Sequence, residues 1–177
     1  SSPMVGSGVP GANRFTVAAL SPLTGCYGEA EAGGWWSPEL KRAGFDAILI
    51  TGRAAKPVYL WIQDGQVEVR DAAHLWGQNT GETQSRIRAE LGDTRIRVAC
   101  IGPAGENLVR YACVVNNLRH TNGRSGMGAV MGSKNLKAVA VKGTGGVQVA
   151  EIGEFWGAVS EHLEGNLMTL DNQWAKD

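Results

Sequence analysis

The sequence predicts an α+β fold. Segments typical of β-strands outnumber those typical of helices, and the two kinds follow one another in a mixed order. They lack the regular alternation of strand and helix that builds a doubly wound parallel sheet. A glycine-rich loop, a Leu-Lys pair and a short strand ending in glycine also occur twice, in the same order. These observations favour a duplicated, β-rich domain with few helices.

The first half of the chain contains four expected elements. Residues 15–20 read as a strand that enters the turn at residues 21–25. Residues 38–43 are expected to form a short helix, and the continuous apolar run at residues 47–51 predicts a buried strand. Alternating apolar residues over 58–69, interrupted by Asp-Gly, are typical of a β-hairpin.

The second half adds two expected helices and two expected strands, apart from the strand at the end of the repeated unit described below. Residues 80–91 read as a helix that ends at Gly92, because glycine readily adopts the left-handed conformation of a helix C-cap. Residues 95–101 and 109–115 are two strand candidates. At the end of the chain, apolar residues at helical spacing predict an amphipathic helix over residues 151–163.

The two copies of the repeated unit span residues 25–52 and 123–143. Their glycine-rich loops cover residues 25–34 and 123–132, and the second copy ends in a strand at residues 138–143. Glycine lets the backbone approach a bulky polyanion closely and supplies turns with positive φ, so duplicated loops suit a ligand with two similar halves. Structural turns in a glycine-rich sheet protein are the alternative, and the spacing leaves both open.

Composition excludes some classes of protein. The chain has 177 residues, enough for one domain with a hydrophobic core, and 25 of them are glycine. Lys and Arg total 17 and so do Asp and Glu, so there is no basic surface for nucleic acid or an anionic membrane. The sequence holds no apolar run of membrane-spanning length and no signal peptide pattern, so we expect a soluble, cytoplasmic protein.

Several familiar motifs are excluded because their residues lack the spacing or the neighbouring elements that the motif requires. The three cysteines form no CxxC pair, and their odd number argues against a disulfide framework. The three histidines are scattered, so no zinc site is predicted. Residues 6–11 match the letters of a dinucleotide-binding fingerprint, but a strand follows them where that motif requires a helix.

Basic residues beside the glycine-rich segments are the candidate ligand contacts. Arg14 and Arg124 each lie where a strand is expected to meet a loop, a position from which a guanidinium can bind a phosphate or a polar heterocycle. Arg119 and His120 lie close to Arg124 in the sequence. Ordinary surface ion pairs are the alternative interpretation of these residues.

Five stretches of sequence carry a resemblance to a known family: Ser21-Pro-Leu-Thr-Gly25, Glu39-Leu-Lys-Arg-Ala-Gly-Phe-Asp46, Lys56-Pro-Val-Tyr59, Ile101-Gly-Pro-Ala-Gly-Glu-Asn-Leu-Val109 and Gly126-Met-Gly-Ala-Val-Met-Gly-Ser-Lys-Asn-Leu-Lys-Ala-Val139. In this order they make the chain, from Pro3 to about Gly143, similar to the N-terminal domain of the aldehyde ferredoxin oxidoreductase family. Members of this family are tungsten enzymes that carry a bis-pyranopterin cofactor.

The resemblance implies a fold and a reaction. Two intertwined β-sheet repeats would form the base of the bis-pyranopterin site. Residues 1–147 would be the pyranopterin-binding domain, truncated at its N-terminus, and residues 148–177 the truncated start of a helical domain.

In the reaction that the resemblance implies, a tungsten or molybdenum centre would oxidise an aldehyde to a carboxylic acid. Electrons would pass through a 4Fe-4S cluster, held by later domains of the same polypeptide, to ferredoxin, so the fragment alone is expected to be inactive. The family also allows a homodimer.

The resemblance also implies a set of site residues, with no catalytic residue among them. The expected cofactor-binding residues are Arg14, Glu31, Ala32, Gly33, Arg119, His120, Thr121 and Arg124. Arg14 matches an arginine that lies between pterin and cluster. The backbone carbonyls of Glu31 and Thr121 would hold a magnesium ion that bridges the two pterin phosphates.

Two positions depart from the family pattern. Glu31 stands where many relatives have asparagine, and His120 stands where they have an arginine, which Arg119 could replace by a one-residue shift. These departures leave open a non-catalytic binding module of the same fold that has lost the metal. A CxxCxxxC cluster later in the gene would distinguish the two. The choice of metal, and of an aldehyde or an aromatic thioester as substrate, also stays open.

Overall fold

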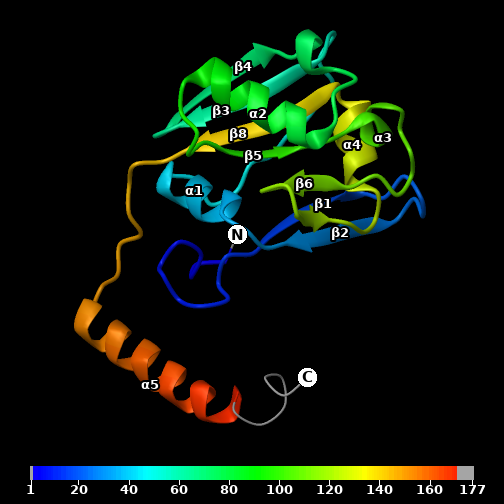
Figure 1. Ribbon diagram of the computed structural model, residues 1–177. Helices are drawn as coiled ribbons and strands as arrows, with labels where there is room; N and C mark the ends of the chain where they lie inside the picture. Colours follow the sequence, from blue (N-terminus) through cyan, green and yellow to red (C-terminus); the bar gives the residue numbers. More distant parts are fainter. Residues whose placement is uncertain (1, 171–177) are drawn as a thin grey trace. The chain divides into compact units, whose positions relative to one another are not determined.

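A computed structural model describes residues 2–170, and the chain divides into two units, Ser1–Gly146 and Val147–Asp177 (Figure 1). All the strands that the structure describes lie in the first unit. The assignment of these units to a pyranopterin-binding domain and the start of a helical domain stays a prediction.

A six-stranded mixed sheet forms the centre of the first unit, in the order β4-β3-β8-β5-β6-β7. Only β3 and β8 pair in parallel, and the other neighbours are antiparallel. The strands are β3 (Val58–Gln63), β4 (Gln66–Asp71), β5 (Arg97–Cys100), β6 (Val114–Asn116), β7 (His120–Asn122) and β8 (Leu136–Lys142). A separate antiparallel hairpin joins β1 (Phe15–Leu20) to β2 (Tyr27–Ala32).

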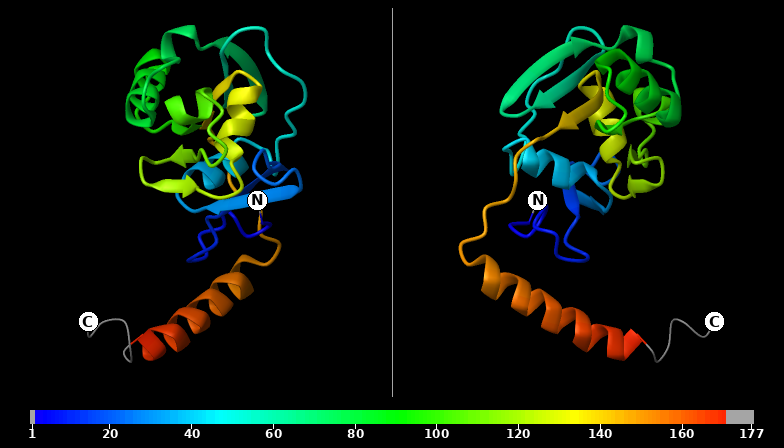
Figure 2. Two further views of the ribbon diagram at one scale, coloured as in Figure 1. Left: turned by 90° about the vertical axis from the view of Figure 1, so that its right-hand side faces the viewer. Right: turned by 60° about the vertical axis from the view of Figure 1, so that its left-hand side comes forward.

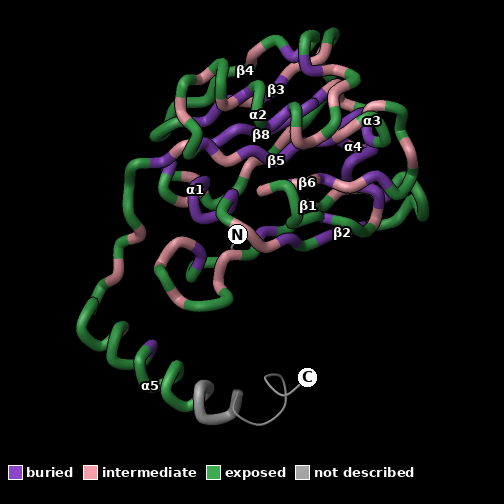
Figure 3. Tube along the Cα trace, viewed as in Figure 1, coloured by how far each residue is buried: buried purple, intermediate pink, exposed green. Residues whose placement is uncertain are grey.

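The sheet separates two hydrophobic cores, and β8 contributes to both. Val139 and Val141 belong to the core that also contains residues of the β1–β2 hairpin, α1 (Trp36–Arg42) and α4 (Met127–Ser133). Ala138 and Ala140 belong to the core beneath α2 (Thr80–Leu91). Because both faces of β8 are covered, its residues 138–141 are apolar without alternation (Figure 3). The α+β prediction is confirmed.

Several predicted elements are confirmed. The β1 strand has the expected bounds, and β3 and β4 form the expected hairpin, with positive φ at both Asp64 and Gly65 in its turn. The α2 helix begins after Asn79, whose side chain accepts a hydrogen bond from the backbone of Glu82, and it ends at Gly92 with φ +72°. These are local signals that do not depend on the rest of the fold.

The two repeats share an order of elements. β1, β2 and α1 follow one another in the first repeat, as β6, β7 and α4 do in the second, and β2 packs against β7. The Leu-Lys pairs are not equivalent, however: Leu40-Lys41 lies in α1, whereas Leu136-Lys137 opens β8. Residues 138–142 form the predicted strand at the end of the second copy.

Both glycine-rich segments were wrongly predicted to be loops throughout. Residues 27–32 form β2, in which small side chains alternate inward. Residues 127–133 form α4, whose glycines allow close helix packing: an added Cβ would lie 2.5 Å from the carbonyl oxygen of Cys113 at Gly128, and 1.9 Å from that of Gly105 at Gly132. These glycines therefore serve packing rather than turns.

Two strand predictions were wrong in extent or kind. Residues 109–115 contribute to a strand only at β6, because residues 109–112 form a turn closed by a hydrogen bond from the amide of Ala112 to the carbonyl of Val109. Residues 47–51 form no strand, and Leu49 is 90% exposed. Figure 2 shows the segment between α1 and β3 as a long cyan loop.

A buried ion pair connects α3 (Pro103–Glu106) to β8. Lys137 is fully buried and bonds both Glu106 and the carbonyl of Gln78 at 2.8 Å. The other carboxylate oxygen of Glu106 accepts the backbone amide of Gly77 at 2.8 Å, in the turn after the 3-10 helix η1 (Ala73–Leu75). The pair is thus well satisfied inside the fold.

The second unit contains α5 (Ile152–Leu170), which covers the helix predicted over residues 151–163 and extends beyond it. Phe155 and Trp156 contact each other edge to face, with ring centroids 5.3 Å apart. No helix in the described part of the chain is long and apolar enough to cross a membrane.

Candidate functional site

An open hollow brings the two repeats together. It has a volume of about 570 Å³ and is lined by residues of the β2 strand, by Arg14 just before β1, and by residues of β7 and the turn that follows it. Four of the eight predicted site residues line it: Arg14, Glu31, Thr121 and Arg124. Residues about a hundred positions apart in sequence thus share one surface.

The alternation of β2 decides which side chains face this hollow. Glu29 and Glu31 point to the exposed side, whereas Gly28, Ala30 and Ala32 are buried. Because the side chain of Ala32 belongs to the hydrophobic core, this residue can offer a ligand only its backbone.

Arg14 and Glu31 form an ion pair across the hairpin. The guanidinium Nε lies 3.2 Å from the Glu31 Oε2, and the two side chains are 63% and 55% exposed. An exposed pair of this kind contributes at most about 1 kcal/mol, so the arginine is free to turn toward another anion. The pairing also compensates the charge of the Glu31 carboxylate.

Polar side chains of the second repeat bind the backbone of the first. The Asn122 Nδ2 donates to the carbonyl of Ala30 at 2.8 Å, and the Ser125 Oγ donates to the carbonyl of Glu29 at 3.0 Å. Asn122 is fully buried. The sequence analysis missed both residues, because these bonds depend on the approach of β7 and the turn after it to the first hairpin.

Asn116 makes the corresponding connection further along the hairpin. Its Nδ2 donates to the carbonyls of Gly33 and His120, at 3.2 and 3.4 Å. At Gly34 the backbone φ is +100°, and an added Cβ would lie 2.5 Å from the Asn116 Oδ1. Gly33 has no such φ, and a Cβ there would make an ordinary contact with the His120 ring at 3.6 Å. Gly34 is therefore the more constrained of the two glycines.

Arg119 lies on the connection between β6 and β7, and His120 is the first residue of β7. Asn117 and Leu118 both have positive φ there, at 47° and 66°. Arg119 is exposed and does not line the hollow, whereas the imidazole of His120 lies beside Gly33. The structure thus places His120 next to the first repeat, and neither His120 nor Arg119 lines the hollow.

The residues present fit a phosphate-bearing organic ligand. Arg14, Arg124 and Thr121 line the hollow and suit anionic oxygens. Glu29 and Glu31 line it too, but Glu31 is paired with Arg14, and Glu29 accepts a hydrogen bond from the Tyr27 hydroxyl. Asn116 and Asn122 each keep a buried Oδ1 without a hydrogen-bond partner within residues 2–170. In the same part of the chain, no three His, Cys, Asp or Glu side chains gather as metal ligands.

Comparison with known proteins identifies the family. The model of the aldehyde ferredoxin oxidoreductase N-terminal domain matches residues 1–143. The chain belongs to the aldehyde ferredoxin oxidoreductase family. It is 47% identical over 161 residues to the tungsten-containing aldehyde ferredoxin oxidoreductase of Pyrococcus furiosus, and 49% identical over 162 residues to that of Pyrococcus abyssi. These matches cover 91% and 92% of this chain and 27% of each relative, so the chain spans about a quarter of their length.

A solved structure shows the same fold. The active site complex BamBC of benzoyl coenzyme A reductase, in complex with 1,5-dienoyl-CoA, matches with a TM-score of 0.94 at 41% identity. The match covers 98% of this chain and 26% of that chain. The family is thus confirmed at the level of both sequence and fold, whereas the roles of the individual site residues stay predictions.

Proposed function

We propose that this chain is the cofactor-binding domain of a tungsten- or molybdenum-dependent oxidoreductase that oxidises an aldehyde to a carboxylic acid. Its electrons would pass through a 4Fe-4S cluster, bound by other parts of the polypeptide, to ferredoxin in the cytoplasm. The proposal draws on the tungsten-containing relatives at 47% and 49% identity. The observation that carries it is the hollow where Arg14 and Glu31 of one repeat meet Thr121 and Arg124 of the other.

Each residue of the hollow has a binding role in this proposal. Arg14 and Arg124 hold anionic and polar groups of the bis-pyranopterin, and the carboxylate of Glu31 orients Arg14. The backbone carbonyls of Glu31 and Thr121 bind a magnesium ion beside the phosphates, since oxygen ligands suit this cation. When bound, the tungsten cofactor supplies the two-electron oxidation of the substrate.

The experiment that tests this proposal compares two variants of the full-length protein. Glu31→Asn changes a side chain that is paired with Arg14 but leaves the backbone carbonyl in place, so tungsten or molybdenum per protein should stay near wild type. Gly33→Val adds a branched side chain where the loop backbone approaches the ligand, so the metal content should fall. Loss of metal in Glu31→Asn with retention in Gly33→Val would contradict the backbone roles.

A second candidate reaction is the reduction of an aromatic thioester. It is favoured by the similarity to BamBC at a TM-score of 0.94 and 41% identity. The two reactions differ in the direction of electron flow, so assays with a viologen dye as acceptor for an aldehyde, and as donor for benzoyl-CoA, distinguish them. Aldehyde-dependent dye reduction without benzoyl-CoA-dependent dye oxidation is the expected result, and the reverse pattern would assign the thioester reaction.

A further inference from the structure

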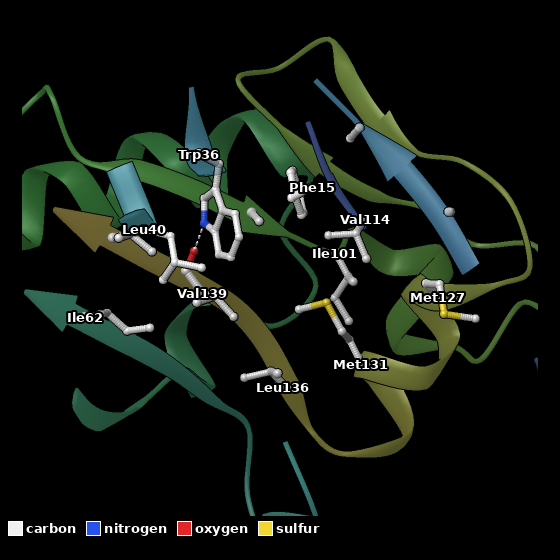
Figure 4. Close-up of a cluster of buried hydrophobic side chains, with 14 of the residues drawn as sticks. Phe15, Trp36, Leu40, Ile62, Ile101, Val114, Met127, Met131, Leu136 and Val139 are labelled. Carbon is white, nitrogen blue, oxygen red and sulfur yellow. Dashed lines mark hydrogen bonds between the residues drawn. The ribbon is translucent and has the colours of Figure 1, made fainter. Parts of the chain in front are cut away.

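A second cavity opens onto the hydrophobic core, away from the residues assigned to the cofactor. It has a volume of about 260 Å³ and lies between β1 and residues 46–50. Its floor is formed by core side chains, among them Trp36, Leu40, Met131 and Leu136 (Figure 4). An apolar cavity of about 150 Å³ already accommodates benzene, so this groove has room for more than one apolar side chain.

Both walls of the groove are backbone edges. Residues 15–19 and 46–50 line it in two unbroken runs. Successive side chains of an extended chain point to opposite faces, so a cavity on one face of the chain is lined by alternate residues. A cavity along the edge of the chain is lined by consecutive residues, as this groove is. β1 pairs with β2 along one edge, and its other edge has no partner strand among the described residues.

The opposite wall includes a run, residues 47–51, that takes part in no backbone pairing in the described part of the chain. Ile48 and Ile50 pack against the core, but Leu49 between them is 90% exposed. Unpaired edges beside an exposed apolar surface are a liability that folded proteins usually cover.

The second repeat shows how such a run behaves when its neighbours are present. There the helix α4 is followed by β8, which pairs with β3 on one side and β5 on the other. In the first repeat the helix α1 is followed by Ala-Ile-Leu-Ile-Thr at residues 47–51, a sequence equally suited to burial on both faces. The missing part of the first repeat is therefore a neighbouring strand.

We propose that the groove between β1 and residues 47–51 receives a β-strand from the part of the same polypeptide outside residues 1–177. This strand adds its backbone hydrogen bonds to both walls and lays alternate apolar side chains on the exposed core. The matched relatives have about three quarters of their length outside the region shared with this chain, so the polypeptide has ample length to supply it. A strand from the same chain also has a far higher effective concentration than a second copy.

Hydrogen exchange in the full-length protein tests the pairing. The amides that face the groove, which are every second amide of residues 47–51 and every second amide of β1 that points away from β2, should exchange at least about a hundredfold more slowly than unstructured backbone. Exchange at the rate of unstructured backbone would overturn the proposal. Protection that disappears on dilution would overturn it too, because it would assign the groove to a second copy.

A matched pair of variants tests the burial. Leu49→Lys should lower the melting temperature of the full-length protein by several degrees and speed exchange at residues 47–51, because a charge would enter the covered groove. Val69→Lys is the control, on the edge strand β4, where the side chain is 67% exposed. Equal melting temperatures for the two variants would overturn the proposal, since Leu49 would then be as accessible as Val69.

Discussion

Gly34 offers a sharp test of how the two repeats are joined. Its φ is +100°, and a Cβ there would lie 2.5 Å from the Asn116 Oδ1 and 3.0 Å from the His120 Cδ2. Gly34→Ala therefore strains the backbone, by about 1–3 kcal/mol, and displaces the amide of Asn116. The lost hydrogen bonds to Gly33 and His120 contribute about 0.5–1.5 kcal/mol each, so the total destabilisation is about 2–6 kcal/mol.

Gly25→Ala is the matched control. Gly25 also has a positive φ, at +71°, but no atom lies within 4 Å of an added Cβ. The backbone strain is therefore the only destabilisation expected in this variant. The assay is the denaturant midpoint of each full-length variant, together with tungsten or molybdenum per protein. Gly34→Ala should show the lower midpoint and lose metal, while Gly25→Ala keeps it. Equal midpoints and equal metal contents would refute the role given to the contact between Gly34 and Asn116.

Three further predictions concern other parts of the chain. Arg14→Lys keeps the charge but loses the planar guanidinium, so ferredoxin reduction by the full-length protein should slow while metal content is retained; an unchanged rate contradicts this role. Burial raises the pKa of the Cys100 thiol to about 12, so iodoacetamide at about pH 8 should modify the exposed Cys26 and spare Cys100; equal labelling refutes the burial. Lys137→Met leaves the Glu106 carboxylate buried and without its cationic partner, so the free energy of unfolding should fall by about 3–5 kcal/mol. A variant with the same denaturant midpoint as the wild type would contradict this.

Local signals made most of the fold predictable. The alternation in β3, the Asp64-Gly65 turn and the cap residues of α2 each act within a few residues, so sequence alone locates them. The α4 helix was missed because its glycines suit a loop locally, while their actual role is contact with backbone distant in sequence. Residues 47–51 were predicted as a strand from their apolar character, but among residues 2–170 no strand pairs with them.

Most residues of the candidate site were predictable, but the ion pair and hydrogen bonds that connect them were not. Family resemblance indicated Arg14, Glu31, Thr121 and Arg124, which the structure gathers around one hollow. The resemblance gave no reason to expect the ion pair between Arg14 and Glu31, because it suggested a backbone role for residue 31 and none for its side chain. Asn122 was missed since its role depends on the approach of β7 to the first hairpin, a tertiary contact with no local pattern.

The most direct test of the central claim is anomalous diffraction from crystals of the full-length protein at the tungsten absorption edge. The proposal that both repeats cradle the cofactor predicts a tungsten peak over the surface that carries Arg14 and Thr121, with pterin density reaching residues of both repeats. A tungsten peak remote from that surface, with the hollow between the repeats filled by protein side chains, would contradict it.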